Sequence, residues 1–394
     1  MQYPRVKLSS AIRLCGVMAL CLSVVGCKRG PGGSADAPVG PFSLAWSEYP
    51  SWSVFGVAEA NGLIDKEAGK KGTIEEKWGI DIVLKQMDYD PCLTAYASGA
   101  VDGVCITNMD VLAPSLSRPS VAVFPTSTSD GADACLVKSN LSLDDLAGIE
   151  THGLEKSVSQ YVFERNLEIQ GRDPKMYKFA NADPAAAAQS MQQGQAESIV
   201  VWNPFMLQTL RSREGQVKVL FDSTTIPEEI IDMVVIGKDA LNRKGGESFA
   251  RALLETYYEV NEMMEGSKRE TTLVQLGEKF SNLSAADMEI VVQQTKFYKN
   301  VNEAMTLLKK ESFRREIMPR VVDFCASHGI VDQKPSIGFD DPSAQLNFST
   351  KYLQQILDEQ ATAAAYAESA AAAAREAPGP SPAEGTRESP AGVE

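Results

Sequence analysis

Carboxylate, amide, hydroxyl and aromatic side chains recur in this sequence at the ends of short apolar segments. Such groups bind small molecules: aromatic rings supply flat apolar walls, and a ring that faces a cationic group contributes about 0.5–2 kcal/mol. An unpaired buried carboxylate is costly, so several of them in one cleft favour a cationic or amine-bearing ligand. The candidate ligand-binding residues are Trp46, Glu48, Tyr49, Asn108, Asp110, Ser129, Asp130, Asp133, Ser157, Trp202 and Asp222.

Some of these residues also have a purely structural interpretation. Asp110 stands where the N-cap of a following helix is expected. Ser157 begins another helix, and the free backbone N–H groups there either need a cap or suit an oxygen-bearing ligand. Asp130 and Asp133 can bond the backbone of their own turn, and Trp202 can pack in a core or beside a hinge. The sequence leaves these alternatives open.

The stretch from Val121 to Val137 organises the elements around these residues. It contains an apolar strand, a Pro/Ser/Thr/Gly-rich break around 127–131, and a second apolar run. Another long apolar run at 230–237 mirrors it. A segment that leaves one sheet and enters another is expected where a chain crosses between lobes. We therefore predict hinge strands near 125–137 and 223–237, with the ligand against the first of them.

Strand and helix patterns alternate on both sides of this stretch. Apolar runs at 42–46, 80–84 and 101–106 are separated by helix-patterned segments at 52–61 and 92–98. This order predicts parallel strands with helices on the faces of the sheet, and the same rhythm returns in the following hundred residues. The later part of the chain is almost entirely helix-patterned, in the segments 247–265, 271–280, 285–298, 301–309 and 313–328.

The sequence therefore predicts an α/β fold of two lobes, joined by two hinge strands and followed by a helical C-terminal extension. A chain of 394 residues suits two cores, since single cores stop growing near about 250–300 residues. The expected divisions are 1–27 for a signal peptide, 28–40 for a flexible tether, 41–130 for the first part of lobe 1, 131–229 for lobe 2, 230–360 for the return strand and helices of lobe 1, and 361–394 for an Ala-rich helix and a disordered tail.

The N-terminal segment has the features of an export signal. Arg5, Lys7 and Arg13 precede an apolar run of about a dozen residues at 14–25, which is short for a membrane span. The run ends before Cys27 in a sequence that resembles the bacterial lipobox. We expect lipidation of Cys27 and retention of an exported protein at a membrane surface. The alternative is a plain cleaved signal with an incidental cysteine.

Charge and cysteine content argue against several other classes of protein. A net charge of −14 without clustered Lys and Arg is unfavourable for binding nucleic acid. Four later cysteines, Cys92, Cys105, Cys135 and Cys325, lack the spacing of a metal knuckle or a redox pair, and the chain has only two histidines. No metal or cofactor is expected, and the cysteines are expected to be buried small side chains or one disulfide.

A series of short motifs occurs in a specific order: Trp46 with Tyr49 and Trp52, then 98–103, 107–110, 129–134, 143–148, Gly194 with Glu197, and 202–204. Together they resemble the substrate-binding proteins of nitrate-, sulfonate- and taurine-type ABC transporters, a family that also contains binders of thiamine-pyrimidine precursors. The resemblance covers about residues 42–330. It departs from the family at 149–153, where members usually have a basic residue, a strand and a Gly-rich entry to the helix.

The resemblance implies a type II periplasmic-binding-protein fold that acts as a two-lobe clamp. The lobes close on a small molecule that both contact, and a permease recognises the closed form. The implied partners are the ligand, the permease and ATPase of an ABC importer, and a membrane reached through the lipid anchor; the protein is expected to be a monomer in the cell envelope. The acidic candidates favour an amine, amide or nitrogen heterocycle over nitrate, sulfonate or taurine.

The rival interpretation is an enzyme on the same fold, of pyrimidine-synthase or menaquinone-pathway type. A fold by itself does not separate a binder from an enzyme. The sequence lacks a cysteine cluster, a Gly-rich phosphate loop and a Ser/His/Asp order with a supporting context. We therefore expect a binding protein and not an enzyme.

Overall fold

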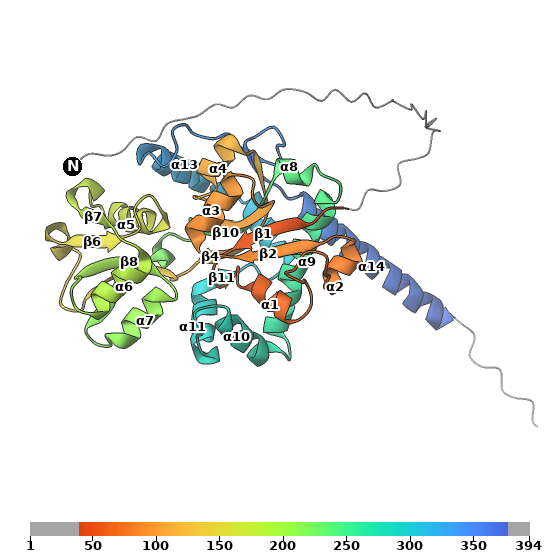
Figure 1. The fold of residues 1–394 in the computed structure, drawn as a ribbon, viewed down its shortest axis with the longest axis horizontal. Helices are drawn as coiled ribbons and strands as arrows, with labels where there is room; N and C mark the ends of the chain where they lie inside the picture. The colour runs from red at the N-terminus through yellow and green to blue at the C-terminus, as the bar shows by residue number, and fades with distance from the viewer. Residues whose placement is uncertain (1–38, 377–394) are drawn as a thin grey trace, which may run out of the picture. The chain divides into compact units, whose positions relative to one another are not determined.

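The computed structural model describes residues 39–376, with side chains described as far as residue 369. Two β-sheets organise this part of the chain, one of eight strands and one of five (Figure 1). The expected signal peptide, the expected lipidation site Cys27 and nearly all of the expected tether lie outside the described residues. We call the eight-stranded sheet with its helices the first lobe, and the five-stranded sheet with its helices the second lobe.

The first sheet contains β1 (Phe42–Trp46), β2 (Ile82–Gln86), β3 (Gly103–Thr107), β4 (Ser120–Ser129), β10 (Ile231–Gly237), β11 (Thr295–Phe297), β12 (Ile337–Phe339) and β13 (Leu346–Phe348). The second contains β5 (Asp133–Lys138), β6 (Glu150–Gly153), β7 (Lys178–Asn181), β8 (Ser198–Trp202) and β9 (Val217–Asp222). The main helices are α1 (Val54–Ala60), α2 (Thr73–Trp78), α3 (Tyr89–Ala97), α4 (Leu112–Ser117), α5 (Val158–Ile169), α6 (Pro184–Gln192), α7 (Phe205–Ser212), α8 (Lys238–Leu241), α9 (Gly246–Glu265), α10 (Arg269–Glu278), α11 (Ala285–Gln294), α12 (Val301–Lys309), α13 (Met318–Ser327) and α14 (Lys351–Glu376).

The strands that connect the lobes lie side by side in the middle of the first sheet, whose order is β12-β13-β4-β10-β3-β1-β2 with β11 beside β4. β1 pairs in parallel with β2 and β3, as the strand-helix-strand pattern predicts. β10 runs antiparallel between β3 and β4, and it places Val234 opposite Phe124. Both of these side chains are fully buried, so the connecting strands are fixed firmly to the first lobe.

The second sheet has the order β7-β6-β8-β5-β9, with β5 antiparallel to both of its neighbours. The chain leaves the first sheet at Ser129 and enters the second at Asp133; it leaves the second at Asp222 and returns at Ile231. We call residues 130–132 the first crossover and residues 223–230 the second crossover. The lobe divisions expected at 130/131 and 229/230 remain predictions, and they fall within or next to these two segments.

The first connecting strand is longer than the sequence predicts. A break was expected around 127–131, but β4 continues through Ser127, Thr128 and Ser129, and only the first crossover is irregular. The polar residues stay in the strand because they pair on both sides, with β10 on one side and with β11 on the other. Their hydroxyl groups are therefore held in rigid positions at the edge of the lobe.

The sequence also predicts too much helix in the last third of the chain. The expected helix at 285–298 ends at Gln294, because the next three residues form β11 on the free edge of β4. β12 and β13 were not expected, and they extend the first sheet beyond β4. α14 runs continuously across the expected division at 360/361. At β11, pairing with the distant strand β4 overrides the local helical pattern.

Each lobe has its own apolar core. One large buried cluster fills the first lobe, and two smaller clusters cover the opposite faces of the second sheet. α5 belongs to both lobes: Phe163 and Leu167 are part of a second-lobe cluster, whereas Val158, Tyr161 and Val162 are part of the first-lobe cluster. The lobes are therefore in direct contact through one face of α5.

The four cysteines that the structure describes are free and buried. Burial raises the pKa of Cys92, Cys135 and Cys325 to about 12. The disulfide that the sequence left open is thus not formed between any of them, and they act as small apolar side chains.

Candidate functional site

Two serines on one face of β4 each bond a buried carboxyl, one from β10 of the first sheet and one from β5 of the second. Ser127 Oγ lies 2.6 Å from Oδ2 of Asp232, the second residue of β10. Ser129 Oγ lies 2.6 Å from Oδ2 of Asp133, the first residue of β5. Alternate residues of a strand point to the same face and are about 7 Å apart. We call Asp133 and Asp232 the carboxyl pair; it stands where the chain passes between the lobes.

A hydroxyl network surrounds Asp232. Ser127 Oγ is also 2.8 Å from Ser51 Oγ, which lies 2.9 Å from Thr126 Oγ1. Tyr49 is buried, and burial, followed by the charges of Asp232 and Asp133, raises the pKa of its hydroxyl well above the usual range. The loop after β1, predicted to face a ligand, therefore reaches the carboxyl pair.

A second network connects Asp133 to Ser223, the first residue of the second crossover. Ser129 Oγ lies 2.7 Å from Ser223 Oγ, and Ser223 Oγ accepts a hydrogen bond from the Gly131 backbone N–H at 2.8 Å. Gly131 has φ +98°, a conformation that glycine adopts without strain. Residues from both crossovers thus meet at Asp133.

The carboxyl pair is buried without a cationic partner. Asp133 is 4% exposed and Asp232 1% exposed, and no ion pair within residues 39–376 includes either of them. Burial raises the pKa of Asp133 to about 6. Burial, and then the charge of Asp133, raises the pKa of Asp232 well above its usual range. The site is therefore short of positive charge.

Six of the buried polar atoms that lack a hydrogen-bond partner in the described residues stand at or near the ends of helices and strands. They come from the ends of β1 and β8 and from the starts of α1, α5 and β11, so both lobes contribute. Such atoms are costly unless a ligand or water satisfies them. They are Trp46 Nε1, Tyr49 Oη, Trp52 Nε1, Thr295 Oγ1, Ser159 Oγ and Asn203 Oδ1. These atoms are therefore available to hydrogen-bond a ligand or water.

Of the three predicted aromatic walls, Trp46, Tyr49 and Trp202, the two tryptophans occupy different positions. Trp46 is 2% exposed and packs in the first-lobe core close to Gly56 of α1. Trp202 is only partly buried, and although it ends a strand of the second lobe it packs against the first-lobe cluster. The neighbouring Asn203 Nδ2 bonds Gln294 Oε1 of the first lobe at 2.8 Å. Trp202 thus lies at the junction of the lobes. The ring of Trp46 is packed in the core, and only its indole N–H lacks a hydrogen-bond partner.

Asp110 and Asn108 follow β3 but have different partners. Asp110 does not cap a helix, because α4 begins later with Val111 in the N-cap position. Its Oδ2 instead accepts hydrogen bonds from Tyr89 Oη at 2.7 Å and Thr107 Oγ1 at 2.8 Å. Burial raises the pKa of Asp110, and its charge contributes to the raised pKa values of both members of the pair. Asn108 instead holds the second crossover in place.

The remaining predicted residues lie on the surface or form local turns. Glu48 is exposed and accepts a hydrogen bond from Ser281 Oγ at 3.1 Å. Asp222 Oδ1 accepts the Thr224 backbone N–H at 2.9 Å, which is a turn contact. Ser157 caps α5, as expected, by accepting the Ser159 backbone N–H. Of the predicted set, the structure therefore brings Tyr49, Ser129 and Asp133 together, with Asp110 and Trp202 beside them.

Asp232, a member of the carboxyl pair, was not among the residues predicted from the sequence. A signal was present, because Asp232 is the one charged residue in the apolar run from Ile230 to Gly237. A charge inside a buried strand calls for a partner or a function. Ser127 and Thr295 were missed for another reason: their segments were assigned to a break and to a helix.

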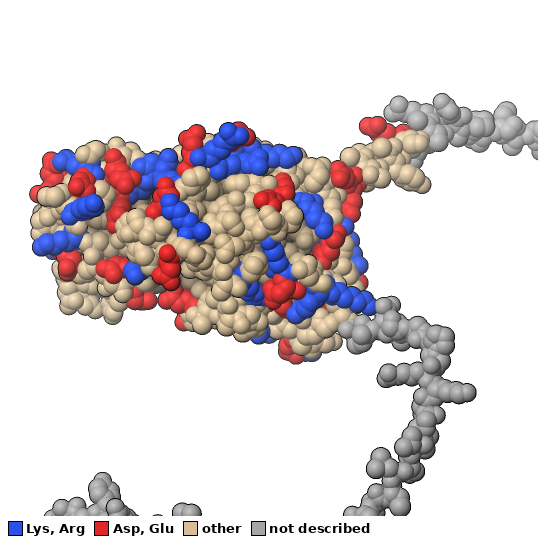
Figure 2. Space-filling model, turned by 90° about the horizontal axis from the view of Figure 1, so that it is seen from above, with Lys and Arg blue, Asp and Glu red and all other residues tan. Residues whose placement is uncertain are grey.

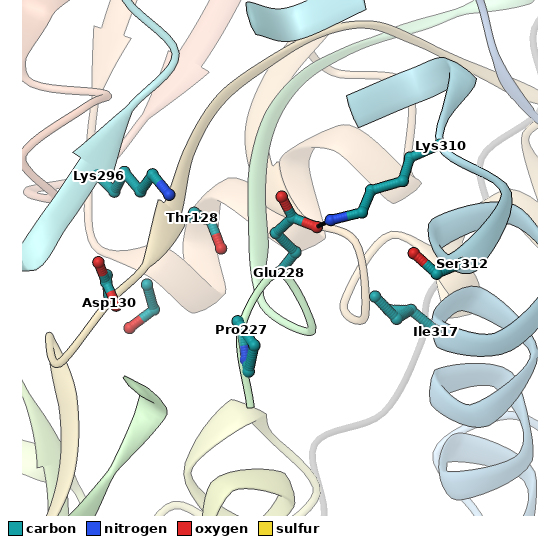
Figure 3. A pocket seen from close by; sticks show the side chains of 9 residues that line it. Thr128, Asp130, Pro227, Glu228, Lys296, Lys310, Ser312 and Ile317 are labelled. Atoms are coloured by element: carbon teal, nitrogen blue, oxygen red, sulfur yellow. Dashed lines mark hydrogen bonds and ion pairs between the residues drawn. The ribbon is translucent and has the colours of Figure 1, made fainter. Parts of the chain in front are cut away.

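A pocket of about 260 Å³ flanks both crossovers (Figure 3). Asp130, which is exposed, lies at one end near Lys296, and at the other end the carboxylate of Glu228 pairs with Lys310. Thr128 lines this pocket, and as the neighbour of Ser127 on β4 it points to the opposite face of the strand. Ser129, which bonds Asp133, also lines the pocket, so the pocket borders the hydroxyl network of the carboxyl pair, and its charges are mixed.

Surface charges are also mixed in sign. On the face seen in Figure 2, acidic and basic side chains are interspersed over the described surface. Within residues 39–369 no group of His, Cys, Asp and Glu is arranged to hold a metal ion. Among the described helices none is long and apolar enough to cross a bilayer. The carboxyl pair is thus buried, and each member accepts a serine hydroxyl on β4 and has no ion-pair partner among the described residues.

The two sheets, the antiparallel connecting strands and the polar edge between them define a two-lobed α/β binding-protein fold. Comparison with solved structures confirms that fold: the chain is similar to periplasmic substrate-binding proteins of ABC transporters. The predicted resemblance is therefore confirmed at the level of the fold. No protein-family model matches the sequence, and no curated protein matches it in sequence.

Three solved structures illustrate the similarity. The periplasmic aliphatic sulphonate binding protein SsuA from Escherichia coli has a TM-score of 0.60 and 18% identity, over 75% of this chain and 94% of that one. A periplasmic sulfonate-binding protein SsuA from Methylobacillus flagellatus has a TM-score of 0.61 and 15% identity, over 82% and 95%. The alkanesulfonate-binding protein SsuA from Xanthomonas axonopodis pv. citri, bound to MOPS, has a TM-score of 0.59 and 15% identity, over 76% and 96%.

Proposed function

We propose that the protein is the solute-binding component of an ABC importer. It captures a small nitrogen-containing molecule, foremost an amine, between its two lobes and delivers it to a permease driven by an ATPase. It acts as a monomer outside the cytoplasm, anchored to a membrane through a lipid on Cys27. It binds its ligand without converting it.

The carboxyl pair is the observation that carries this proposal. Asp133 and Asp232 are buried at the point where both connecting strands meet, and no cation of the described chain pairs with them. A buried charge without a partner is strongly unfavourable. A ligand ammonium supplies the missing charge, and its N–H groups can bond carboxylate, hydroxyl and amide oxygens.

The same charges are unfavourable for an anion. The three solved structures compared above are described as sulfonate-binding, but a sulfonate at this position would lie next to two buried carboxyls. Like charges within a few ångströms repel strongly where water is excluded. The fold therefore supports capture and delivery, whereas the side chains of this site support a different ligand class.

Closure follows from the position of the site. Asp232 and Tyr49 belong to the first lobe, and Asp133 and Ser159 belong to the second. A ligand that contacts all of them binds the closed form better than the open form. It shifts the equilibrium toward closure by its differential affinity for the two forms and by no more than that.

A thermal-shift screen of the purified protein tests the proposal. The panel contains ethanolamine, putrescine, choline, a pyrimidine, taurine, an alkanesulfonate and nitrate. We expect at least one amine to raise the melting temperature in proportion to its concentration, as any ligand that binds only the folded state does. Stabilisation by the sulfonate or nitrate alone would contradict the amine preference. Recovery of a converted product in place of the added compound would favour the enzyme.

Binding of an amine should weaken at low pH. The pKa of Asp133 is raised to about 6, so a proton competes with the ligand cation below that pH. From the titration of Asp133 alone, the affinity of an amine with its own pKa above 9 should be about tenfold weaker at pH 5.0 than at pH 7.5. Isothermal titration at the two pH values measures this, and Asp133→Asn should abolish most of the difference. An affinity that rises on acidification would indicate an anionic ligand.

The folded ligand-free protein should show the opposite trend in stability. A carboxyl whose pKa is raised by folding holds its proton more tightly in the folded state than in the unfolded state. Stability contributed by Asp133 is therefore present at low pH and is lost as the pH rises from about 4 toward about 6. Chemical unfolding at pH 4.5 and 7.0, compared between wild type and Asp133→Asn, isolates this contribution.

A further inference from the structure

Helix α5 presents one of its faces to the first lobe. Tyr161, Glu164 and Arg165 have the spacing i, i+3, i+4, which places them on one side of the helix. Opposite them lie Arg320 and Phe324 of α13, a helix whose apolar side chains belong to the first-lobe core. This face is the contact between lobes noted above, and it carries charged groups in addition to apolar ones.

Glu229 of the second crossover lies at the centre of this contact. Its side chain is 7% exposed and interacts with three groups. Tyr161 Oη donates a short hydrogen bond to Oε2, and Arg165 Nε donates to the same oxygen at 3.1 Å. Arg320 Nη1 donates to Oε1 at 2.6 Å. One buried carboxylate is thus shared by two groups of the second lobe and one of the first.

The backbone of Glu229 is fixed to the first lobe. Asn108 Nδ2 donates to the Glu229 carbonyl at 3.1 Å, and Asn108 Oδ1 accepts the Ile231 N–H at 3.0 Å. Glu229 is therefore a rigid acceptor on the first lobe for the hydroxyl and guanidinium groups of α5. If the lobes separate, the bonds to Tyr161 and Arg165 break while those to Asn108 remain.

Two further contacts join the same pair of helices. His328 Nε2, at the end of α13, lies 2.9 Å from Glu164 Oε2. The rings of Tyr161 and Phe324 meet edge to face with centroids 4.9 Å apart. In each contact, one residue belongs to α5 and the other to α13 or its C-cap. The position of α5 against the first lobe is therefore defined by polar and aromatic contacts that involve no ligand.

We propose that Glu229, with Tyr161 and Arg165, forms a latch that holds the lobes together in the absence of ligand and thereby sets the affinity of the candidate ligand site. This inference rests on the proposed closure of two lobes. When only the closed form binds, the apparent dissociation constant is the intrinsic one divided by the closed fraction. A latch that raises the closed fraction strengthens binding without touching the ligand.

Single-molecule energy transfer on the ligand-free protein tests the latch. Dyes are coupled to non-natural residues at Glu76 and Gln195, two exposed positions, one in each lobe, so that no cysteine is modified. In wild type we expect the short distance to predominate. Tyr161→Phe keeps the ring contact with Phe324 and removes only the hydroxyl. It should raise the ratio of long to short distance about tenfold, which corresponds to about 1.4 kcal/mol for one bond to a charged group.

Matched variants within the second lobe serve as controls. Arg165→Gln should act like Tyr161→Phe, whereas Arg172→Gln, which removes an arginine paired with Asp144 of its own lobe, should leave the distances unchanged. Tyr177→Phe controls for the loss of a tyrosine hydroxyl. Each variant is first checked for an unchanged circular dichroism spectrum and cooperative melting.

The outcomes separate the latch from the proposed function, because no ligand is present in the measurement. A wild-type protein that shows only the long distance, or Tyr161 and Arg165 variants that match wild type, overturns the latch even if amines bind tightly. If the distances change as described, the latch proposal stands even when the ligand proves not to be an amine. With any bound probe from the screen, Tyr161→Phe should also speed dissociation several-fold.

Discussion

Replacing both members of the carboxyl pair, as Asp133→Asn with Asp232→Asn, is expected to weaken amine binding at least 100-fold at pH 7.5. Each substitution keeps the size of the side chain and an oxygen for Ser129 or Ser127, but it removes the negative charge. A hydrogen bond to a charged group contributes about 1.5–3 kcal/mol, and the two carboxyls share the ligand ammonium. Titration calorimetry of the strongest amine from the screen measures the loss.

The same double variant should be no less stable than wild type. The unpaired buried carboxyls have pKa values raised by burial, so their ionisation at neutral pH opposes folding, and the amides do not carry that penalty. Asp222→Asn is the matched control: it also removes one negative charge near the second crossover, but its carboxylate bonds only a turn. An affinity that survives the double substitution, or falls equally in the control, contradicts the assignment of the site.

Substituting Asn108 is expected to destabilise the protein by about 3 kcal/mol. Both ends of this buried amide bond the backbone around the second crossover, so Asn108→Ala leaves the Ile231 N–H and the Glu229 carbonyl without these partners. Each buried group left unsatisfied costs about 1–3 kcal/mol. Urea unfolding followed by fluorescence measures the change in the free energy of unfolding.

The control for this prediction is Asn61→Ala. Asn61 also donates through its amide to a backbone carbonyl, that of Val57, but it is exposed. It should cost less than about 1 kcal/mol, since water replaces the lost bond. Equal costs at the two positions would mean that Asn108 does not anchor the crossover.

The architecture was predictable because it rests on local patterns. Apolar runs such as 42–46 and 230–237 form strands, and alternation of strand and helix implies parallel pairing, which β1 shows with β2 and β3. The cap at Ser157 and the strand positions around Phe124 were likewise visible in the sequence. The two-lobed fold follows from these features together with the resemblance.

The parts that were mispredicted depend on long-range pairing. The sequence around Thr295 has a helical pattern, but β4 has a free edge nearby, and pairing with Ser129 satisfies backbone groups of both segments. The same pairing keeps Ser127 and Ser129 in a strand and directs their hydroxyls at Asp232 and Asp133. Local sequence patterns do not indicate that Thr295 pairs with Ser129, a residue far away in the sequence.

The candidate site was predicted in part for the same reason. Tyr49, Ser129 and Asp133 were identified because polar residues follow apolar runs, and they do converge. Asp232 was not predicted as a site residue because it lies inside an apolar run and was assigned with its neighbours to a strand. A buried acid in such a run is itself informative, since its burial has to be compensated by a partner or used by a ligand.

The most direct test of the account is to identify the small molecule that the protein carries when it is isolated from the cells that make it. The protein is purified without added ligand and denatured, and the released compounds are identified by mass spectrometry against a sample of the Asp133→Asn/Asp232→Asn variant prepared in the same way. The account predicts one compound with a basic nitrogen that is released from wild type and missing from the variant. Release of a sulfonate or nitrate, or of the same compound from both samples, would contradict it.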